Sequence, residues 1–161
     1  MFLRAISSFL LLPGIFAGCL PWLISEYDPW RGRGWQPGVL VGATGLVILL
    51  VCVREFHVTG MGTLAPWNPP RQLVTCGLYR YCRNPMYLAV LLIIAGWTLS
   101  CGSPLLLGYG FFAAAAFHVR IVHYEEPCLA MQFPRQWQLY AGSVPRWLPK
   151  LPLVFFHSAG K

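Results

Sequence analysis

Residues 77–99 read GLYRYCRNPMYLAVLLIIAGWTL and join a polar cluster to an uninterrupted apolar run. Asn84 precedes Pro85, a pair typical of a helix start, with Asn as N-cap and Pro in the first turn. We therefore expect an apolar helix whose free N–H groups face any bound anion. Arginine and tyrosine are also ordinary residues at a membrane interface. This alternative accounts for Tyr79 and its neighbours, but it accounts less well for the residues beside Pro85.

The composition indicates that this helix lies in a bilayer. Of the 161 residues, 57% are hydrophobic, 15% aromatic and only 11% charged, which leaves too little polar surface for a soluble domain. The formal net charge is +7, but the basic residues are scattered singly between apolar runs. No basic stripe appears, so we expect membrane lipids rather than nucleic acid as partners. The length suits a single domain over residues 1–161.

Four apolar segments can be drawn, at about residues 5–24, 39–53, 86–99 and 104–122. We predict an all-α integral membrane protein with four transmembrane helices, although the second and third segments are short for a span of roughly 20 residues. The first two spans would occupy residues 1–58, a binding core 59–150 and a tail 151–161. The first segment also resembles a lipoprotein signal ending in FAGC, but its apolar run continues past the cysteine.

The positive charges predict the orientation. The link at residues 100–103 carries none, and the link that holds Arg31 and Arg33 also holds two acidic residues. The other basic residues fall mainly on the opposite side: Arg4, Arg54, Arg71, Arg80, Arg83, Arg135, Arg146, Lys150 and Lys161. Because positively charged loops stay in the cytoplasm, we expect both termini there (N-in, C-in), with the segment between the second and third spans.

Two segments on this cytoplasmic side differ in character. Residues 55–73 are rich in Gly, Pro and Thr, which predicts an ordered loop rather than a helix. From Pro127 onward, PCLAMQFPRQWQLYAG carries apolar residues at helical spacing: Leu129, Phe133, Trp137 and Tyr140. We expect this amphipathic tail, opened by Pro127 and interrupted by Pro134, to lie on the membrane surface or over a pocket.

A second polar cluster, HVRIVHYEEP, occupies residues 118–127 at the end of the fourth segment. His118 and Arg120 fall inside apolar sequence, where ionisable side chains usually face the interior. Glu125 and Glu126 are expected at a helix C-terminus, whose dipole they oppose, so arginines of the first cluster should compensate them. This contact is either a structural ion pair or the wall of a ligand pocket. The later motif VPRWLP, taken alone, suits an interfacial anchor.

The six cysteines do not indicate a metal site. They form no CxxC, and no histidine pairs with them at ligand spacing. Several lie in apolar runs, where a thiol behaves as a small hydrophobe. We expect mostly unpaired thiols and no metal.

GLYRYCRNPMYLAVLLIIAGW followed by YEEPCLAMQFPRQWQLYAGSVPRWLP resembles the isoprenylcysteine carboxyl methyltransferase family, in particular its small prokaryotic members. It is similar, more distantly, to membrane phospholipid N-methyltransferases. The resemblance covers about residues 60–149, and the order and spacing of its motifs are specific. Asn84 stands where many relatives have His, and Ala89 and Pro134 stand where Gly is usual. Because Asn does not titrate near neutral pH, the first departure argues against an acid or base there.

The resemblance implies an S-adenosylmethionine pocket on the cytoplasmic side of a prokaryotic inner or plasma membrane, covered by the tail. The family pattern carries over to these cofactor-site residues: Tyr79, Arg83, Asn84, Pro85, Tyr87, Glu125, Glu126, Trp137, Tyr140 and Arg146. Arg83 and Glu126 are the expected catalytic residues. Arg83 would hold an isoprenylcysteine-type carboxylate, whereas a glutamate would take the proton of an amine or thiol acceptor. A lipophilic or small acceptor would arrive sideways from the bilayer.

Two other classes stay open. Sterol reductases resemble this family in their C-terminal membrane region and bind a nicotinamide cofactor. This chain is short for that larger fold and shows no second basic cluster for a 2′-phosphate. A non-enzymatic relative could keep the pocket shape. The sequence does not identify the acceptor, its reacting atom or the oligomeric state.

Overall fold

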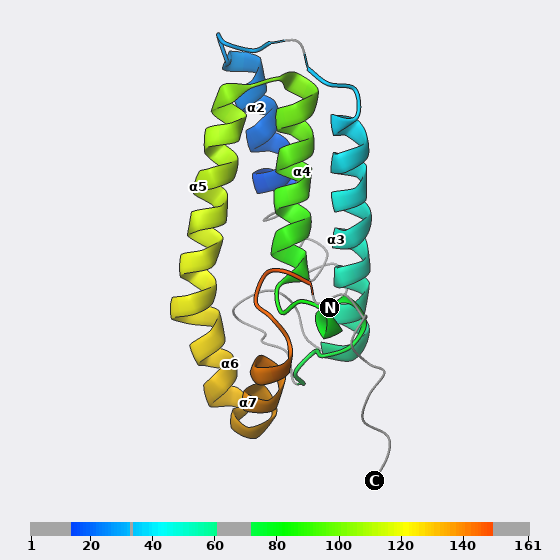
Figure 1. The fold of residues 1–161 in the computed structure, drawn as a ribbon, viewed down its shortest axis with the longest axis vertical. Helices are drawn as coiled ribbons and strands as arrows, with labels where there is room; N and C mark the ends of the chain where they lie inside the picture. The colour runs from blue at the N-terminus through cyan, green and yellow to red at the C-terminus, as the bar shows by residue number, and fades with distance from the viewer. Residues whose placement is uncertain (1–13, 33, 61–71, 150–161) are drawn as a thin grey trace.

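The described part of the chain is helical, apart from turns and short connections. The computed structural model describes residues 14–32, 34–60 and 72–149. Its elements are η1 (Ile15–Cys19), α2 (Leu20–Tyr27), α3 (Gly38–Gly60), η2 (Gly77–Arg80), α4 (Pro85–Cys101), α5 (Pro104–Arg120), η3 (Ile121–Glu125), α6 (Glu126–Gln132) and α7 (Pro134–Ser143). No strand occurs in these ranges, so the all-α prediction is confirmed for them. In Figure 1, α2 to α5 run along the long axis, and α6 and α7 lie at one end, here called the α7 end.

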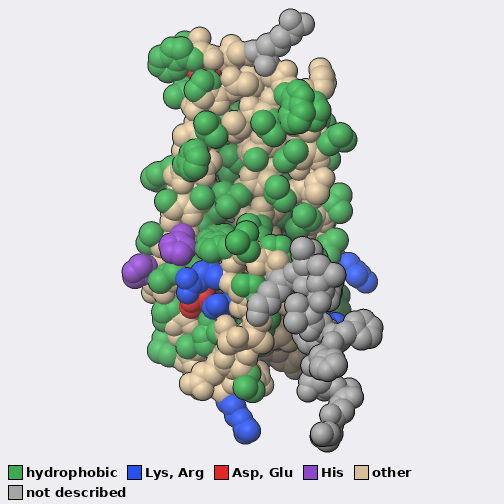
Figure 2. Space-filling view, viewed as in Figure 1, with side chains coloured by type: hydrophobic (Ala, Val, Ile, Leu, Met, Phe, Trp, Pro, Cys, Tyr) green, Lys and Arg blue, Asp and Glu red, His purple; other side chains and the backbone are tan. Residues whose placement is uncertain are grey.

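Two helices are long and apolar enough to cross a membrane: Gly38–Glu55 within α3, and the continuous helix Pro104–Gln132 formed by α5, η3 and α6. In one 18-residue apolar window of each helix, only 22% and 17% of the residues are buried, so most of the apolar surface of these windows faces outward. Figure 2 shows apolar side chains over most of one face. The apolar helix α4 is shorter (Pro85–Cys101). Four spans stay a prediction, because the described part of the first segment begins only at residue 14.

α3 and α4 pack closely because glycines lie between them. A Cβ on Gly96 would lie 2.5 Å from the Cα of Gly42. A Cβ on Gly45 would lie 2.8 Å from the carbonyl oxygen of Ala89. Small residues let helix backbones approach closely in a bilayer, where association depends on packing. This contact fixes α4, and with it the polar residues that precede α4, against α3.

At the opposite end, here called the Asp28 end, Asp28 joins the segment after α2 to the start of α5. It is 6% exposed and accepts hydrogen bonds from the Ser103 hydroxyl and from the N–H groups of Trp30 and Leu105, at 2.9 and 3.3 Å. Burial alone would raise the pKa of Asp28, but these hydrogen bonds hold it below its usual value. Asp28 therefore supports Ser103, whose hydroxyl accepts the Leu106 N–H as the N-cap of α5.

Two predicted boundaries are wrong. The fourth helix continues to Gln132, so Glu125 and Glu126 lie inside a helix rather than at its C-terminus. Pro127 lies in the first turn of α6, as expected, but α6 follows η3 without a break. The π-helical turn η3 lies directly before α6, and the N–H of Glu126 donates to the carbonyl of Ile121. α3 also runs to Gly60, so residues 55–60 are helical; residues 61–71 lie outside the described part. α7 begins at Pro134, which confirms the predicted interruption.

Candidate functional site

The polar residues before α4 gather at the α7 end, where Arg83 has the largest number of partners. Its Nη1 donates to Oε1 of Glu126 at 2.9 Å, and its Nε donates to the carbonyl of Val144 at 2.8 Å. Its guanidinium also lies 5.8 Å from the ring centre of Trp137. The Arg83 side chain is only 15% exposed. One side chain therefore joins the start of α4 to α6, to α7 and to the segment after α7.

Glu126 is held by two arginines. Besides Arg83, Arg146 donates from Nε to Oε1 and from Nη2 to Oε2 of Glu126, each at 2.8 Å. This two-point geometry is the strong form of an arginine–carboxylate pair. The hydrogen bonds to Glu126 raise the pKa of Arg146 above its usual value. The prediction that arginines of the first cluster compensate the glutamates is confirmed for Arg83 and Glu126.

Glu125 has different partners. Its Oε1 accepts hydrogen bonds from the Tyr87 hydroxyl and from Nε of Arg120, the latter at 2.8 Å. The Arg120 side chain is 53% exposed, and exposed His118 accepts a hydrogen bond from the Trp147 indole at 3.1 Å. The expectation that Arg120 and His118 face the interior is therefore wrong. Long or amphipathic side chains near the end of an apolar segment can reach polar surroundings instead.

Residues 144–147, here called the strap, follow α7 and lie along the turn that leads into α4. Each of the four strap carbonyls accepts a hydrogen bond from Cys82, Arg83 or Asn84. Burial raises the pKa of the Cys82 thiol, which keeps it protonated as a donor. Asn84 is the N-cap residue of α4, as predicted, but its side chain makes no capping hydrogen bond; its amide instead donates to the Arg146 carbonyl at 3.1 Å.

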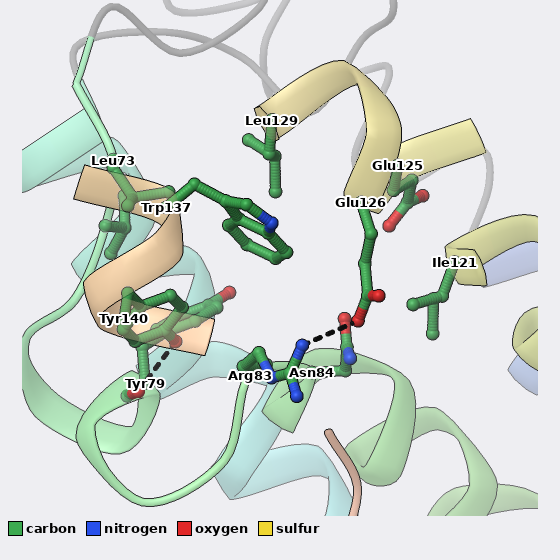
Figure 3. A pocket seen from close by; sticks show the side chains of 11 residues that line it. Leu73, Tyr79, Arg83, Asn84, Ile121, Glu125, Glu126, Leu129, Trp137 and Tyr140 are labelled. Carbon is green, nitrogen blue, oxygen red and sulfur yellow. Dashed lines mark hydrogen bonds and ion pairs between the residues drawn. The ribbon is translucent and has the colours of Figure 1, made fainter. Parts of the chain in front are cut away.

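A pocket of about 480 Å³, including open space at its mouth, lies among η2, η3, α6, α7 and the start of α4. Its lining residues are Leu73, Val74, Tyr79, Arg83, Asn84, Ile121, Glu125, Glu126, Leu129, Trp137 and Tyr140. Figure 3 shows the Trp137 ring and the Leu129 side chain directed into it, near the ion pair of Arg83 and Glu126. The amphipathic tail thus covers a pocket, one of its two predicted locations.

Two buried tyrosines fix one wall of this pocket. The Tyr140 hydroxyl donates to the carbonyl of Tyr79 at 2.8 Å, which joins α7 to η2. Burial raises the pKa of both phenols, so both stay protonated at neutral pH. These side chains can pack against a ligand or donate a hydrogen bond, but they are poor bases.

Most of the predicted site residues come together here. Those that line the pocket are Tyr79, Arg83, Asn84, Glu125, Glu126, Trp137 and Tyr140. Pro85 is buried in the first turn of α4, whereas Tyr87 and Arg146 contact the glutamates of the wall. A cofactor role for all ten residues stays a prediction. The sequence did not indicate Leu73, Val74 or Ile121, because an apolar side chain in a pocket has the same sequence pattern as one in a core.

The chemistry available in the pocket is that of carboxylates, guanidinium groups and aromatic rings. Within the described ranges, no three metal-ligating side chains come together. No two of the cysteines are bridged.

The comparisons with known proteins identify a family for most of the chain. Residues 36–136 match the family described as phospholipid methyltransferase (PEMT), from just before α3 to the first turn of α7. The chain belongs to this phospholipid methyltransferase family. The finer assignment to isoprenylcysteine carboxyl methyltransferases stays a prediction.

A second similarity is to a reductase. Over 91 residues, 55% of this chain, the sequence is 36% identical to Delta(14)-sterol reductase TM7SF2 of Mus musculus. The chain spans only 21% of the length of that protein. No solved structure matches the chain. The similarity to the sterol reductase is therefore confined to part of both proteins.

Proposed function

We propose that the chain is an integral membrane methyltransferase that uses S-adenosylmethionine, with its pocket facing the cytoplasm. Membership of the phospholipid methyltransferase family supports a methyltransferase-type enzyme. The observation that carries the proposal is the pocket, in which Glu125, Arg83 and the Trp137 ring come together beside outward-facing apolar helices. Such a set is complementary to a ligand with an ammonium, a carboxylate and a purine.

The wall residues fit S-adenosylmethionine in charge and polarity. Glu125 has one exposed arginine partner, so its carboxylate is available to a cationic group of the cofactor. Arg83 and Asn84 offer donors for the cofactor carboxylate, and Trp137 and Tyr79 offer an apolar surface for the adenine. When bound, S-adenosylmethionine supplies an electrophilic methyl group that is transferred in a single in-line displacement.

The residues of the chain would bind, orient and exclude water. Glu126, fixed by Arg146, orients the Arg83 guanidinium beside Trp137. Tyr87 orients Glu125 through its hydroxyl. On this basis, Glu126 has a positioning role, and Glu125 is the better candidate for direct contact with the reacting groups.

The ion pairs also bear on the acceptor. Arg83 and Arg146 both contact Glu126, and Arg120 contacts Glu125, so these three arginines are already compensated. Of the three, only Arg83 lines the pocket, and in this proposal its remaining donors bind the cofactor carboxylate, so an acceptor carboxylate would have to compete with the cofactor for it. An amine or thiol acceptor would instead use Glu125 as the base that takes its proton. We therefore favour a lipophilic amine or thiol over an isoprenylcysteine-type carboxylate.

Calorimetric titration of the detergent-purified protein with S-adenosylhomocysteine tests the proposal. We expect saturable binding by the wild type and at least about tenfold weaker binding by Glu125→Gln, because a hydrogen bond to a charged group contributes about 1.5 to 3 kcal/mol. Glu26→Gln is the matched control, since Glu26 lies at the Asp28 end and its side chain is 61% exposed. No binding by a folded wild type would refute the proposal.

A nicotinamide-dependent reductase is the second candidate, favoured by the 36% identity to Delta(14)-sterol reductase TM7SF2. Titration of the same protein with NADPH separates the two. A protein that binds NADPH but not S-adenosylhomocysteine would support the reductase and refute the methyltransferase proposal. A folded protein that binds neither would be a non-enzymatic relative.

A further inference from the structure

Glu55 contacts the pocket wall from a helix that contributes no side chain to the pocket lining. It lies in the last part of α3, and its Oε2 accepts a hydrogen bond from the backbone N–H of Leu78 at 3.0 Å. Leu78 belongs to η2, 23 residues further along the chain. In the described ranges, no arginine or lysine lies within ion-pair distance of Glu55. Within the described part of the chain, the Glu55 carboxylate therefore binds backbone.

Gly77 shows how closely the carboxylate approaches the turn. The φ angle of Gly77 is +57°, in the left-handed region that favours glycine. A Cβ built on Gly77 would lie 1.7 Å from Oε1 of Glu55. The space that any other residue would need is thus occupied by Glu55. The chain at residues 77–78 and the α3 carboxylate fit only because residue 77 has no side chain.

The turn that Glu55 holds carries part of the pocket. Tyr79, one residue after Leu78, lines the pocket, and its carbonyl accepts the Tyr140 hydroxyl. One turn before Glu55, fully buried Cys52 packs with Tyr79 and Val74, a second lining residue. The same face of α3 therefore supports this wall by packing at Cys52 and by a hydrogen bond at Glu55.

We propose that Glu55 is a positioning residue for the ligand pocket: its carboxylate caps η2 and thereby fixes the Tyr79 wall against the bound ligand. The proposal rests on the proposed function for the identity of that ligand, S-adenosylmethionine. A carboxylate at the first N–H groups of a short helical turn also meets the positive end of the peptide dipoles. Without it, the Leu78 N–H loses its partner, and the turn is free to change its backbone angles.

Two substitutions separate positioning from charge. Glu55→Ala removes the acceptor, whereas Glu55→Gln removes the charge but keeps a carbonyl that can accept the Leu78 N–H. We expect Glu55→Ala to weaken S-adenosylhomocysteine binding about fivefold to tenfold, the effect of losing the partner of the half-buried Leu78 N–H. Glu55→Gln should restore binding to within about twofold of the wild type. Glu26→Ala, which removes an exposed carboxylate at the Asp28 end, is the control.

Hydrogen exchange of residues 77–80 gives a readout that does not depend on the ligand. These amides should exchange faster in Glu55→Ala than in the wild type and at the wild-type rate in Glu55→Gln. Unchanged exchange of these amides in a folded Glu55→Ala protein would overturn the proposal. If the wild type binds S-adenosylhomocysteine, an equal affinity of Glu55→Ala would overturn it as well. If the wild type binds no S-adenosylhomocysteine, the proposed function fails, and exchange alone decides whether Glu55 fixes the turn.

Discussion

The adjacent glutamates of the pocket have different surroundings, and this difference predicts different effects on stability. The Glu126 side chain is 16% exposed and contacts two arginines, so Glu126→Ala leaves both guanidinium groups without their anion. Breaking a buried ion pair costs about 3 to 5 kcal/mol. Because Arg146 is 34% exposed and partly screened, we expect a loss of about 2 kcal/mol in the free energy of unfolding. The melting temperature in detergent should fall by several degrees.

Glu125→Ala is the matched comparison at the next position. Glu125 is 29% exposed and its partner Arg120 is 53% exposed, so water compensates the remaining charge. We expect a loss below about 1 kcal/mol. A melting temperature that falls equally in both variants would show that Glu126 has no special structural role.

Asp28 predicts a pH dependence at the opposite end. Its pKa lies below the ordinary 3.8 because hydrogen bonds from Ser103, Trp30 and Leu105 outweigh burial. A lowered folded-state pKa means that the ionised form stabilises the fold above pH 3.8, and that this contribution disappears as the pH falls through the folded-state value. Asp28→Asn should lower the melting temperature at pH 7 and reduce its fall below pH 4, measured against Glu26→Gln. If the melting temperatures of the wild type and Asp28→Asn fall by the same amount between pH 7 and pH below 4, this prediction is contradicted.

Side-chain pairs at the site could be predicted better than contacts to backbone. Charged side chains beside an apolar helix are costly unless they are paired, and basic residues outnumber the five acidic residues. An ion pair between a glutamate and an arginine was therefore expected, as Arg83 and Glu126 form. The strap could not be predicted, because every residue carries a carbonyl and the sequence does not show which one Asn84 will bind. For the same reason, the contact of Glu55 with the Leu78 N–H left no trace in the sequence.

At the scale of helices, the contact between α3 and α4 predicts an asymmetric response to the same substitution. Gly96→Ala places a Cβ 2.5 Å from the backbone of Gly42, so the helices must separate. Overpacking of this kind costs about 1 to 3 kcal/mol. Gly108→Ala in α5 is the control, because a Cβ there meets nothing within 4 Å and alanine favours the helix by about 1 kcal/mol. In thermal unfolding, the melting temperature of Gly108→Ala should therefore be higher than that of the wild type, and that of Gly96→Ala should be lower.

The central parts of the helices were predicted from the sequence more accurately than their ends. The third segment, expected at 86–99, is α4 at Pro85–Cys101, because the Asn84–Pro85 start and the left-handed Gly102 mark both ends. The end of the fourth segment, expected near residue 122, was wrong, since the π-helical turn that joins α5 to α6 has no recognisable sequence pattern. The extension of α3 to Gly60 was hidden by the glycines and threonine that follow Glu55.

At the scale of the whole molecule, charge and pocket lie at the same end. One described arginine, Arg31, lies at the Asp28 end. The others lie toward the α7 end with the pocket: Arg54, Arg80, Arg83, Arg120, Arg135 and Arg146. Composition alone predicted a bilayer environment, because a chain with 57% hydrophobic residues cannot cover its surface with polar groups, and two helices are long and apolar enough to span one. The location of the site followed from the clustering of polar residues at one end of each apolar segment.

This asymmetry predicts that the α7 end faces the cytoplasm, since arginine-rich ends are retained on that side. Gln36 and Gln136 are both exposed, the first at the Asp28 end and the second in α7. In a chain whose Cys19, Cys76 and Cys128 are replaced by serine, we expect a membrane-impermeant maleimide to label Gln36→Cys on intact bacterial spheroplasts. Gln136→Cys should react only after lysis.

Labelling of both cysteines on intact spheroplasts would contradict a bundle whose two ends lie on opposite sides of the membrane. The reverse pattern would place the pocket outside the cell, although the helices would pack in the same way. Because S-adenosylmethionine is a charged solute that does not cross a bilayer freely, an outward pocket could not bind the cytoplasmic cofactor. The orientation measurement therefore tests the proposed function independently of any binding assay.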